Sequence, residues 1–306
     1  MGLTRREFLK ICGGTVAGLS LSQSLIPEIV GAFEKAVHGK PPVLWIQGAG
    51  CTGCSVSLLN TVHPNIAEVL IKIIDLRYHP TIMAAAGETA IEALEETARE
   101  AKGKYVLVVE GSIPTAAGGR YCVVGEKGGK EITMLEWTTH LGKDAAAVLA
   151  FGNCAAFGGI PAAHPNPTGA KGVMEIFKGR GIRTPVINVP GCPSHPDWMV
   201  GTIAHILLYG LPELDELNRP SVFFGGILHE HCPYRGFFDE EVFSKTFPQK
   251  EGCRYQLGCK GPEVSCDAWK RKWNTGVNWC VADAICIGCT EPGFWDKFAP
   301  IYQPLE

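Results

Sequence analysis

Cysteines at short spacings are the residues of this sequence best suited to chemistry. The chain has 13 cysteines in 306 residues, and thiolates at C-x2-C spacing commonly bind iron-sulfur clusters or structural zinc. Most of them, with one histidine, form three sets of four. The first set is Cys51, Cys54, Cys154 and Cys192; the second is His229, Cys232, Cys253 and Cys259; the third is Cys266, Cys280, Cys286 and Cys289. We expect the remaining Cys12 and Cys122 to be free thiols.

Electron transfer is the chemistry that three such sets predict. His229 and Cys232 can present an imidazole and a thiolate to one centre, with His231 as the competing histidine. A structural zinc protein, or buried cysteines without metal, is the alternative, since zinc also uses C-x2-C pairs. We find no Ser/His/Asp or Cys/His nucleophile arrangement, which argues against hydrolysis. Three sets in one chain suggest a relay between a buried reaction centre and a surface acceptor.

Short apolar runs alternating with helical patterns predict a parallel α/β sheet between residues 41 and 218. Predicted strands cover 43–47, 71–76, 105–109, 146–151 and 186–189, and predicted helices cover 84–102, 132–141, 172–179 and 196–209. Ligands of such sheets lie beyond the carboxyl ends of the strands. The loops GAGCTGC, GNCAAFGG and PGCPSHP follow predicted strands and carry the whole first set. Their glycines allow backbone to approach a bulky cofactor.

The composition and the periodicity of the sequence change after Asn218. Regular periodicity fades, aromatic residues and glycines become frequent, and six cysteines lie between Cys253 and Cys289. A segment with so few apolar runs is hard to fold on its own core, and metal clusters would supply cross-links. We therefore predict a leader over 1–40, an α/β domain over 41–218 and a mostly irregular, metal-dependent domain over 219–306.

The N-terminal motif TRREFLK, followed by a Gly- and Ser-rich apolar run, is typical of a twin-arginine export signal. An amphipathic helix or a membrane anchor is the alternative, but Pro27 and Glu28 interrupt the run. Export in the folded state allows metal insertion in the cytoplasm, which reconciles many thiols with an exported chain. We expect no transmembrane anchor, and a net charge of -3 without a basic cluster argues against nucleic acid.

Longer motifs make the chain resemble a known family over nearly its whole length. They are WIQGAGCTGCSVSLLN, EGSIPTAAGGRYC, GNCAAFGGIPAA, NVPGCPSHPDWMVGT, HEHCPYRGFF, LGCKGP and NWCVADAICIGC. In these motifs the chain resembles the small, iron-sulfur subunit of periplasmic nickel-iron hydrogenases, and most closely the nickel-iron-selenium branch. The family's usual PGCPPHP reads PGCPSHP here, with Ser194 at the variant position.

The resemblance implies a flavodoxin-like parallel-sheet domain and a cluster-stabilised C-terminal iron-sulfur domain. It implies a proximal 4Fe-4S cluster on the first set, a distal one on the second and a medial one on the third. Most standard members carry proline at the position of Cys280 and hold a 3Fe-4S medial cluster, whereas the selenium branch carries cysteine and holds 4Fe-4S. Glu88 falls where some members carry a carboxylate able to approach the proximal cluster; a solvated glutamate at a helix start is the alternative.

The resemblance also implies partners. The nickel-iron site would lie in a separate large subunit, because this chain lacks the two C-x2-C pairs that would bind it. The expected activity of the heterodimer is oxidation or evolution of hydrogen, with a soluble periplasmic multihaem cytochrome c as electron partner. Two rivals remain, a standard nickel-iron small subunit without selenium and a quinone-reductase-type electron-transfer subunit, which would not need the ligands of the second domain.

Overall fold

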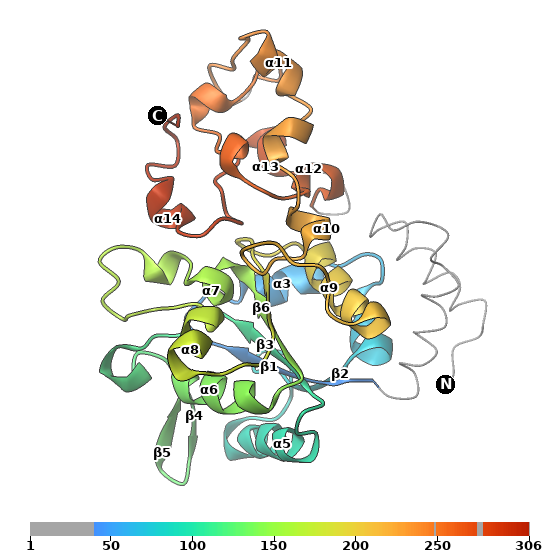
Figure 1. Cartoon of the computed structure of the whole chain (residues 1–306), viewed down its shortest axis with the longest axis vertical. Coiled ribbons are helices and arrows are strands. Elements are labelled where there is room, and N and C mark those ends of the chain that lie inside the picture. Colours follow the sequence, from blue (N-terminus) through green and yellow to red (C-terminus); the bar gives the residue numbers. More distant parts are fainter. Residues whose placement is uncertain (1–39, 248, 274–277, 306) are drawn as a thin grey trace, which may run out of the picture.

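Five parallel strands form the central sheet of the protein (Figure 1). The structure is a computed structural model and describes residues 40–247, 249–273 and 278–305. The strands are β1 (Pro42–Gln47), β2 (Asp75–Tyr78), β3 (Val106–Glu110), β6 (Ala147–Phe151) and β7 (Val186–Val189). They lie in the order β2-β1-β3-β6-β7, which is the flavodoxin-like order of a doubly wound sheet. The predicted parallel α/β fold is therefore confirmed.

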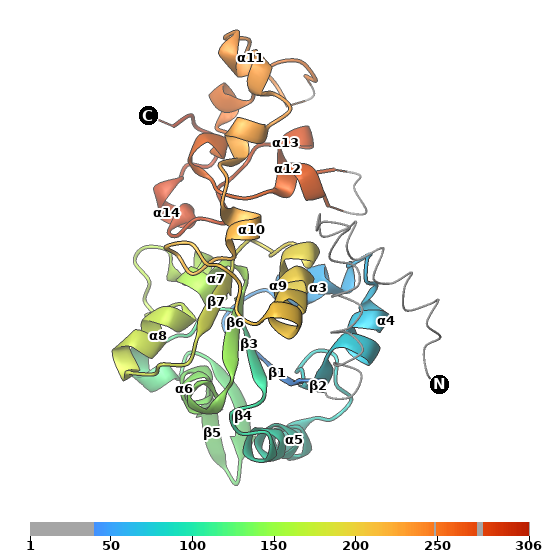
Figure 2. The same cartoon turned by 45° about the vertical axis from the view of Figure 1, so that its right-hand side comes forward.

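Alternating side chains of the strands build a core on each face of the sheet. Val43 and Trp45 of β1 are buried on one face, and Leu44 and Ile46 on the other. β3 and β6 are buried along their whole length, which requires helices on both faces of the sheet. The first face is covered by α3 (Gly53–Leu59), α4 (Ile66–Glu68), the π-helix η2 (Val69–Ile73) and α9 (Pro196–Tyr209), and the second by α5 (Gly87–Glu100), α6 (Met134–Asp144) and α8 (Val173–Arg180) (Figure 2).

Two predicted elements differ from the structure. The predicted strand at 71–76 is wrong in its first half, because η2 runs to Ile73 and β2 begins only at Asp75. Its apolar run buries Val69 and Ile73 against the sheet, and a short apolar run does not by itself distinguish a strand from a buried helix. The predicted helix at 132–141 begins inside β5 (Lys130–Thr133), which pairs antiparallel with β4 (Val123–Lys127).

Four shorter helical segments complete the chain up to residue 224. These are η3 (Ala116–Gly119), α7 (Gly152–Phe157), η4 (Ile160–Ala162) and α10 (Ser221–Phe224). α7 follows β6 directly and α3 follows the loop after β1, so both helices begin at the carboxyl edge of the sheet. This edge faces the C-terminal region in Figure 1.

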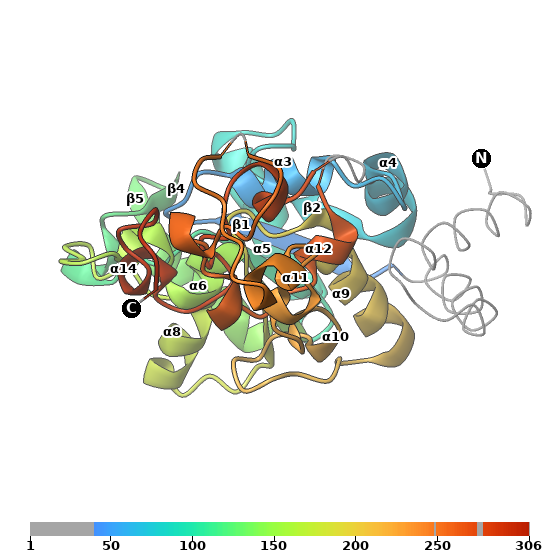
Figure 3. The same ribbon diagram turned by 90° about the horizontal axis from the view of Figure 1, so that it is seen from above.

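Residues beyond Asn218 form short helices joined by irregular segments above the carboxyl edge of the sheet (Figure 3). After α10 these are η5 (Leu228–His231), α11 (Arg235–Asp239), η6 (Tyr255–Leu257), η7 (Gly261–Glu263), α12 (Ala268–Arg271), α13 (Cys280–Asp283) and α14 (Phe294–Lys297). Phe224, Trp279 and Phe294 belong to the same buried cluster as Trp45 of β1. The two regions therefore share one continuous core.

The predicted export signal and Cys12 lie outside the described residues, and the boundaries at 40 and 218 stay predictions. Among the residues that the structure describes, no helix is both long and apolar enough to cross a membrane.

Candidate metal centres

The structure brings the four cysteines of the first set together at the carboxyl edge of the sheet. Cys51 lies in the loop after β1 and Cys54 in the first turn of α3, while Cys154 lies in α7 and Cys192 follows β7. Cys154 is close enough to Cys51 and Cys192 for their negative charges to raise its pKa. Three separate loops thus converge because parallel strands end at the same edge of the sheet.

Two glycines leave the space that the sulfur atoms of this set occupy. A Cβ atom on Gly152 would lie 2.4 Å from Cys54 Sγ, and one on Gly159 would lie 2.5 Å from Cys154 Sγ. Both glycines also have positive φ angles, +83° and +59°, which other residues rarely adopt. The backbone therefore approaches the thiols of the first set closely at both positions, and the predicted approach to a bulky cofactor stays a prediction.

The thiols of Cys54, Cys154 and Cys192 in the first set have raised pKa values and resist ionisation unless a cation is bound. Burial raises the pKa of Cys54 well above its usual value, and the charge of Glu110 raises it further. Burial also raises the pKa of Cys154 to about 12. A metal binds thiolates and displaces their protons, so bound iron would remove both the desolvation cost and the mutual repulsion. The donor set therefore fits an iron-sulfur cluster.

Glu110 is a functional candidate that the sequence reasoning missed. Its carboxylate is only 3% exposed and accepts hydrogen bonds from the backbone N–H of Cys54 (2.9 Å) and of Ser55 (3.1 Å). It also accepts from Ser55 Oγ (2.5 Å), Trp45 Nε1 (3.0 Å) and Gln47 Nε2 (3.0 Å). Five donors hold this negative charge beside the first set. The signal in the sequence was the glutamate that ends the apolar run VLVVE.

Glu88 lies elsewhere, and the structure favours its alternative reading. It is exposed in the first turn of α5, and its Oε1 accepts from the N–H of Gly128 at 3.1 Å in the β4-β5 turn. Glu88 is therefore a solvated glutamate at a helix start, and Glu110 is the carboxylate that contacts the first set.

The third set surrounds a cavity between the sheet and the C-terminal region. Cys266, Cys280, Cys286 and Cys289 line a volume of about 440 Å³, together with Cys192 of the first set and mainly apolar side chains such as Trp198 and Ile285. Burial raises the pKa of Cys289 to about 12. Cys286 donates a hydrogen bond to the sulfur of Cys280, which lowers the pKa of Cys280 and raises that of Cys286. An apolar cavity walled by four thiols fits a thiolate-bound cluster.

The second set lies in irregular segments at the far side of the C-terminal region. Burial lowers the pKa of His229, so its imidazole is neutral, as a metal ligand must be. Its Nε2 atom is buried and has no hydrogen-bond partner within the described structure, which is unfavourable in a protein interior unless another group is bound there. His231 is exposed and stacks on Trp269 with ring centroids 5.4 Å apart. His229 is therefore the better-placed histidine.

Cys259 of the second set and His229 lie beside the same glycine. A Cβ atom on Gly261 would lie 3.5 Å from Cys259 Sγ and 3.8 Å from His229 Cβ. Burial raises the pKa of Cys232 to about 11, and the charges of Cys259 and Cys253 raise it further. The structure thus brings all four predicted residues of this set into one neighbourhood.

Direct contacts join the three sets in a spatial order that differs from their order in the chain. Cys192 of the first set lines the same cavity as the third set, and Nδ2 of Asn153, the residue before Cys154, donates to the carbonyl oxygen of Cys289 at 2.8 Å. The N–H of Lys260, the residue after Cys259 of the second set, donates to the carbonyl oxygen of Cys286 in the third set at 2.8 Å. The third set therefore lies between the other two.

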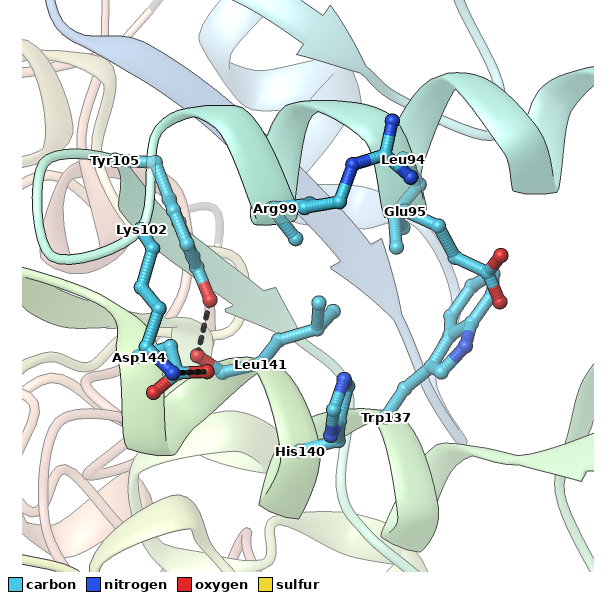
Figure 4. Close-up of a pocket in the computed structure, with 10 residues that line it drawn as sticks. Leu94, Glu95, Arg99, Lys102, Tyr105, Trp137, His140, Leu141 and Asp144 are labelled. Atoms are coloured by element: carbon cyan, nitrogen blue, oxygen red, sulfur yellow. Dashed lines mark hydrogen bonds and ion pairs between the residues drawn. The ribbon is translucent and has the colours of Figure 1, made fainter.

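Other polar features of the described chain stand apart from these sets. Cys122 is partly buried beside the core of the second sheet face, and burial raises its pKa. A hollow of about 380 Å³ lies between α5 and α6, near the amino end of β3, and its described lining contains no cysteine (Figure 4). An ion pair of Lys102 with Asp144 (3.1 Å) closes one side of it. Across the described residues, no three His, Cys, Asp or Glu side chains meet at the spacing of a single metal ion.

Two family models match this chain. Residues 51–206 match the 20 kDa subunit of NADH ubiquinone oxidoreductase, and residues 224–302 match the C-terminal part of NiFe/NiFeSe hydrogenase small subunits. The first match covers the strands β2, β3, β6 and β7 and the whole first set, and the second covers the region with the other two sets.

Relatives and solved structures extend the match to the whole chain. The periplasmic NiFeSe hydrogenase small subunit of Desulfomicrobium baculatum is 51% identical over 99% of both chains. The periplasmic NiFe hydrogenase small subunit of Solidesulfovibrio fructosivorans is 40% identical over 99% of this chain and 93% of that protein. The solved NiFeSe hydrogenase from Desulfovibrio vulgaris Hildenborough matches with a TM-score of 0.84 and 54% identity, over 86% of this chain and 98% of that chain. This chain therefore belongs to the small subunits of periplasmic NiFe and NiFeSe hydrogenases.

Proposed function

We propose that this chain is the electron-transfer subunit of a heterodimeric periplasmic hydrogenase and binds three 4Fe-4S clusters. The first set would hold the proximal cluster, the third set the medial cluster and the second set the distal cluster. Each cluster supplies one-electron redox chemistry when bound. The partner would be a large subunit that carries the nickel-iron site, and hydrogen oxidation or evolution would be the activity of the pair.

The observation that carries this proposal is the spatial order of the three sets. Cys192 lines the cavity of the third set, Asn153 beside Cys154 binds the carbonyl of Cys289, and Lys260 beside Cys259 binds that of Cys286, which supports a line of sets from the sheet edge into the C-terminal region. A relay needs its centres in such a line, whereas separate structural zinc sites do not. The protein's own part is to hold each centre with thiolates and one neutral imidazole, and to exclude water with buried apolar walls.

The distal end would deliver electrons to a periplasmic multihaem cytochrome c. Relatives of this chain are named periplasmic hydrogenase subunits, and the twin-arginine motif TRREFLK would export the chain in its folded state. Cys280 supports the selenium branch, because it gives the third set a fourth thiol. Whether the large subunit contains selenocysteine is decided by that subunit's own gene.

Purification of the heterodimer, followed by iron and acid-labile sulfide analysis and redox-titrated EPR, tests the proposal. We expect about a dozen irons, in three 4Fe-4S clusters. His229→Ala should change the EPR signal of one cluster alone, and His231→Ala, which alters the exposed neighbour, should leave all three signals unchanged. A colourless protein that contains zinc would refute the proposal, as would a loss of signal from His231→Ala equal to that from His229→Ala.

A further inference from the structure

Two buried cations of the C-terminal region lack an acidic partner. Arg219, Arg254 and Lys260 are 5%, 2% and 2% exposed. Arg219 forms ion pairs with Asp215 (2.7 Å) and Glu291 (2.9 Å). In the described part of the chain, neither Arg254 nor Lys260 has a carboxylate within ion-pair distance, and their hydrogen bonds go to backbone carbonyls. A buried charge without a counter-charge is strongly unfavourable.

The guanidinium of Arg254 is held only by groups without net charge. Its Nη1 donates to the carbonyl oxygens of Val281 (2.6 Å) and Ala284 (2.9 Å), and its Nη2 donates to that of Gln249 (3.4 Å). Its Cζ lies 5.4 Å from the centre of the Tyr234 ring, and its Nε is buried without a hydrogen-bond partner. The side chain is thus firmly positioned, but no described residue supplies a counter-charge to it.

Arg254 lies at the junction of two thiol sets. It directly follows Cys253 of the second set, and Lys260 likewise follows Cys259. Two of the three carbonyls that Arg254 binds belong to α13 and the residue after it, and α13 begins with Cys280 of the third set. One side chain therefore ties the loop of the second set to the helix of the third.

We propose that Arg254 is the fixed counter-charge of the centres held by the second and third sets, and a positioning residue for α13. The inference rests on the proposed function. A thiolate-bound cluster is anionic and gains one more negative charge on reduction, so a buried cation nearby stabilises the reduced form more than the oxidised form. Arginine suits this role because its charge persists at every physiological pH. The presence of Arg254 should therefore raise the reduction potentials of the medial and distal clusters.

Three variants of the intact heterodimer test this role. Arg254→Met removes the charge and keeps most of the apolar stem, Arg254→Lys keeps the charge and loses the planar fork, and Arg235→Met removes a half-exposed cation near the second set. Redox-titrated EPR gives the potentials of all three clusters, and iron analysis gives their occupancy. We expect Arg254→Met to shift the medial and distal potentials downward and to leave the proximal one unchanged. In Arg254→Lys the medial and distal potentials should stay close to those of the unaltered protein. Arg235→Met should shift them less than Arg254→Met does, because exposed charges are screened.

Each outcome decides the matter. Full occupancy with unchanged potentials in Arg254→Met would overturn the inference. If Arg254→Met loses iron from the second or third set while Arg254→Lys retains it, the charge is needed to hold the clusters and the inference stands. Equal losses of iron in both variants would show that Arg254 has a structural role alone and would refute its role as a counter-charge. Absence of iron-sulfur signals from the unaltered heterodimer would instead refute the proposed function itself.

Discussion

The two ends of the line of thiol sets are built in opposite ways. The first set lies on loops that follow β1, β6 and β7, and the strands' own hydrogen bonds fix those loops. The second set lies on short helices and irregular segments, with His229 Nε2 unsatisfied among the described groups. From this difference we expect the sheet edge to position its ligands without metal and the C-terminal region to depend on what its ligands bind.

The ends also differ in the sign of their buried charge. Glu110 places a negative charge against the backbone of Cys54, and Arg254 places a positive charge between the second and third sets. A negative charge favours the oxidised form of a nearby centre and a positive charge favours the reduced form. If the proposed clusters are bound, Glu110 and Arg254 would together favour movement of an electron away from the sheet edge and toward the second set.

Removal of iron should have the largest effect and should separate the two ends. We expect residues 219–306 to lose protection against amide hydrogen exchange by about 4 kcal/mol or more, because metal that binds only the folded state stabilises it by mass action. The strands should stay protected. Hydrogen exchange of the isolated subunit with and without chelator measures this, and equal loss in both regions would show that the shared core, not the metal, decides stability.

Gly152→Ala should break the first set by sterics alone. The new Cβ would lie 2.4 Å from Cys54 Sγ at a φ of +83°, and we expect a loss of about 3 kcal/mol in unfolding free energy, together with the proximal cluster. Gly103→Ala is the matched control, since Gly103 has a φ of +74° and open space around it. It should cost about 1 kcal/mol and leave the iron content intact. Similar iron loss in both variants would contradict the inference that Gly152 leaves the space that the Cys54 sulfur needs.

Glu110→Gln should sharpen the contrast in charge. The amide cannot accept all five hydrogen bonds, so we expect a loss of about 2 kcal/mol in stability. The proximal potential should rise, opposite in sign to the shift expected for Arg254→Met. Glu88→Gln, at an exposed site, should change stability by less than about 0.5 kcal/mol and leave the potential unchanged. A proximal potential that does not move in Glu110→Gln would disprove the electrostatic difference between the ends.

Acid should weaken the sheet end through His79. This side chain is 1% exposed, its Nε2 lies 3.1 Å from Ser55 Oγ, and burial lowers its pKa to about 4. The unfolded chain, with a histidine pKa of about 6.5, therefore binds the proton more readily, and stability falls as the pH drops below that value. We expect a loss of about 2 kcal/mol between about pH 7 and pH 5. Urea unfolding should show a smaller loss in His79→Gln, and an identical pH dependence would exclude this residue.

Cys280→Pro should have the smallest effect on stability. Cys280 is the first residue of α13, a position where proline is well tolerated. Trp279 before it is extended (φ -150°, ψ 169°), which is the conformation that a following proline favours. We expect a change within about 1 kcal/mol, a medial cluster with one iron fewer, and a higher medial potential. Ala282→Pro is the control, because it removes the bond from the Ala282 N–H to the Trp279 carbonyl. An unaltered iron count and medial EPR signal in Cys280→Pro would show that Cys280 is no ligand.

The sequence was sufficient for the features that depend on local pattern. The strands at 43–47 and 186–189 lie where apolar runs predicted them, and their shared carboxyl edge follows from parallel topology. The run at 71–76 was misassigned because its apolar residues cover the sheet as part of η2 rather than joining it fully as a strand. Its length and composition suit both structures.

Glu110 and Arg254 could not be found from the sequence because their roles depend on distant partners. The donors to Glu110 come from β1 and α3, and the acceptors for Arg254 come from α13. A glutamate that ends a strand and an arginine after a cysteine look ordinary until the burial and partners of each are known. Glu88, by contrast, lies at a helix start that the pattern did predict, and its hydrogen bond goes to the β4-β5 turn.

The third set lies between the other two in space but comes last in the chain, so it is synthesised after both of the sets that it lies between. Translation delivers the sheet-edge cysteines first, then the outermost set, and only at the end the middle one. The side chain of Asn153 and the N–H of Lys260 meet the carbonyl oxygens of Cys289 and Cys286 only when this last segment arrives. A chain cut short by a few dozen residues would therefore retain the cysteines of both terminal sets and lack those of the set that we propose connects them.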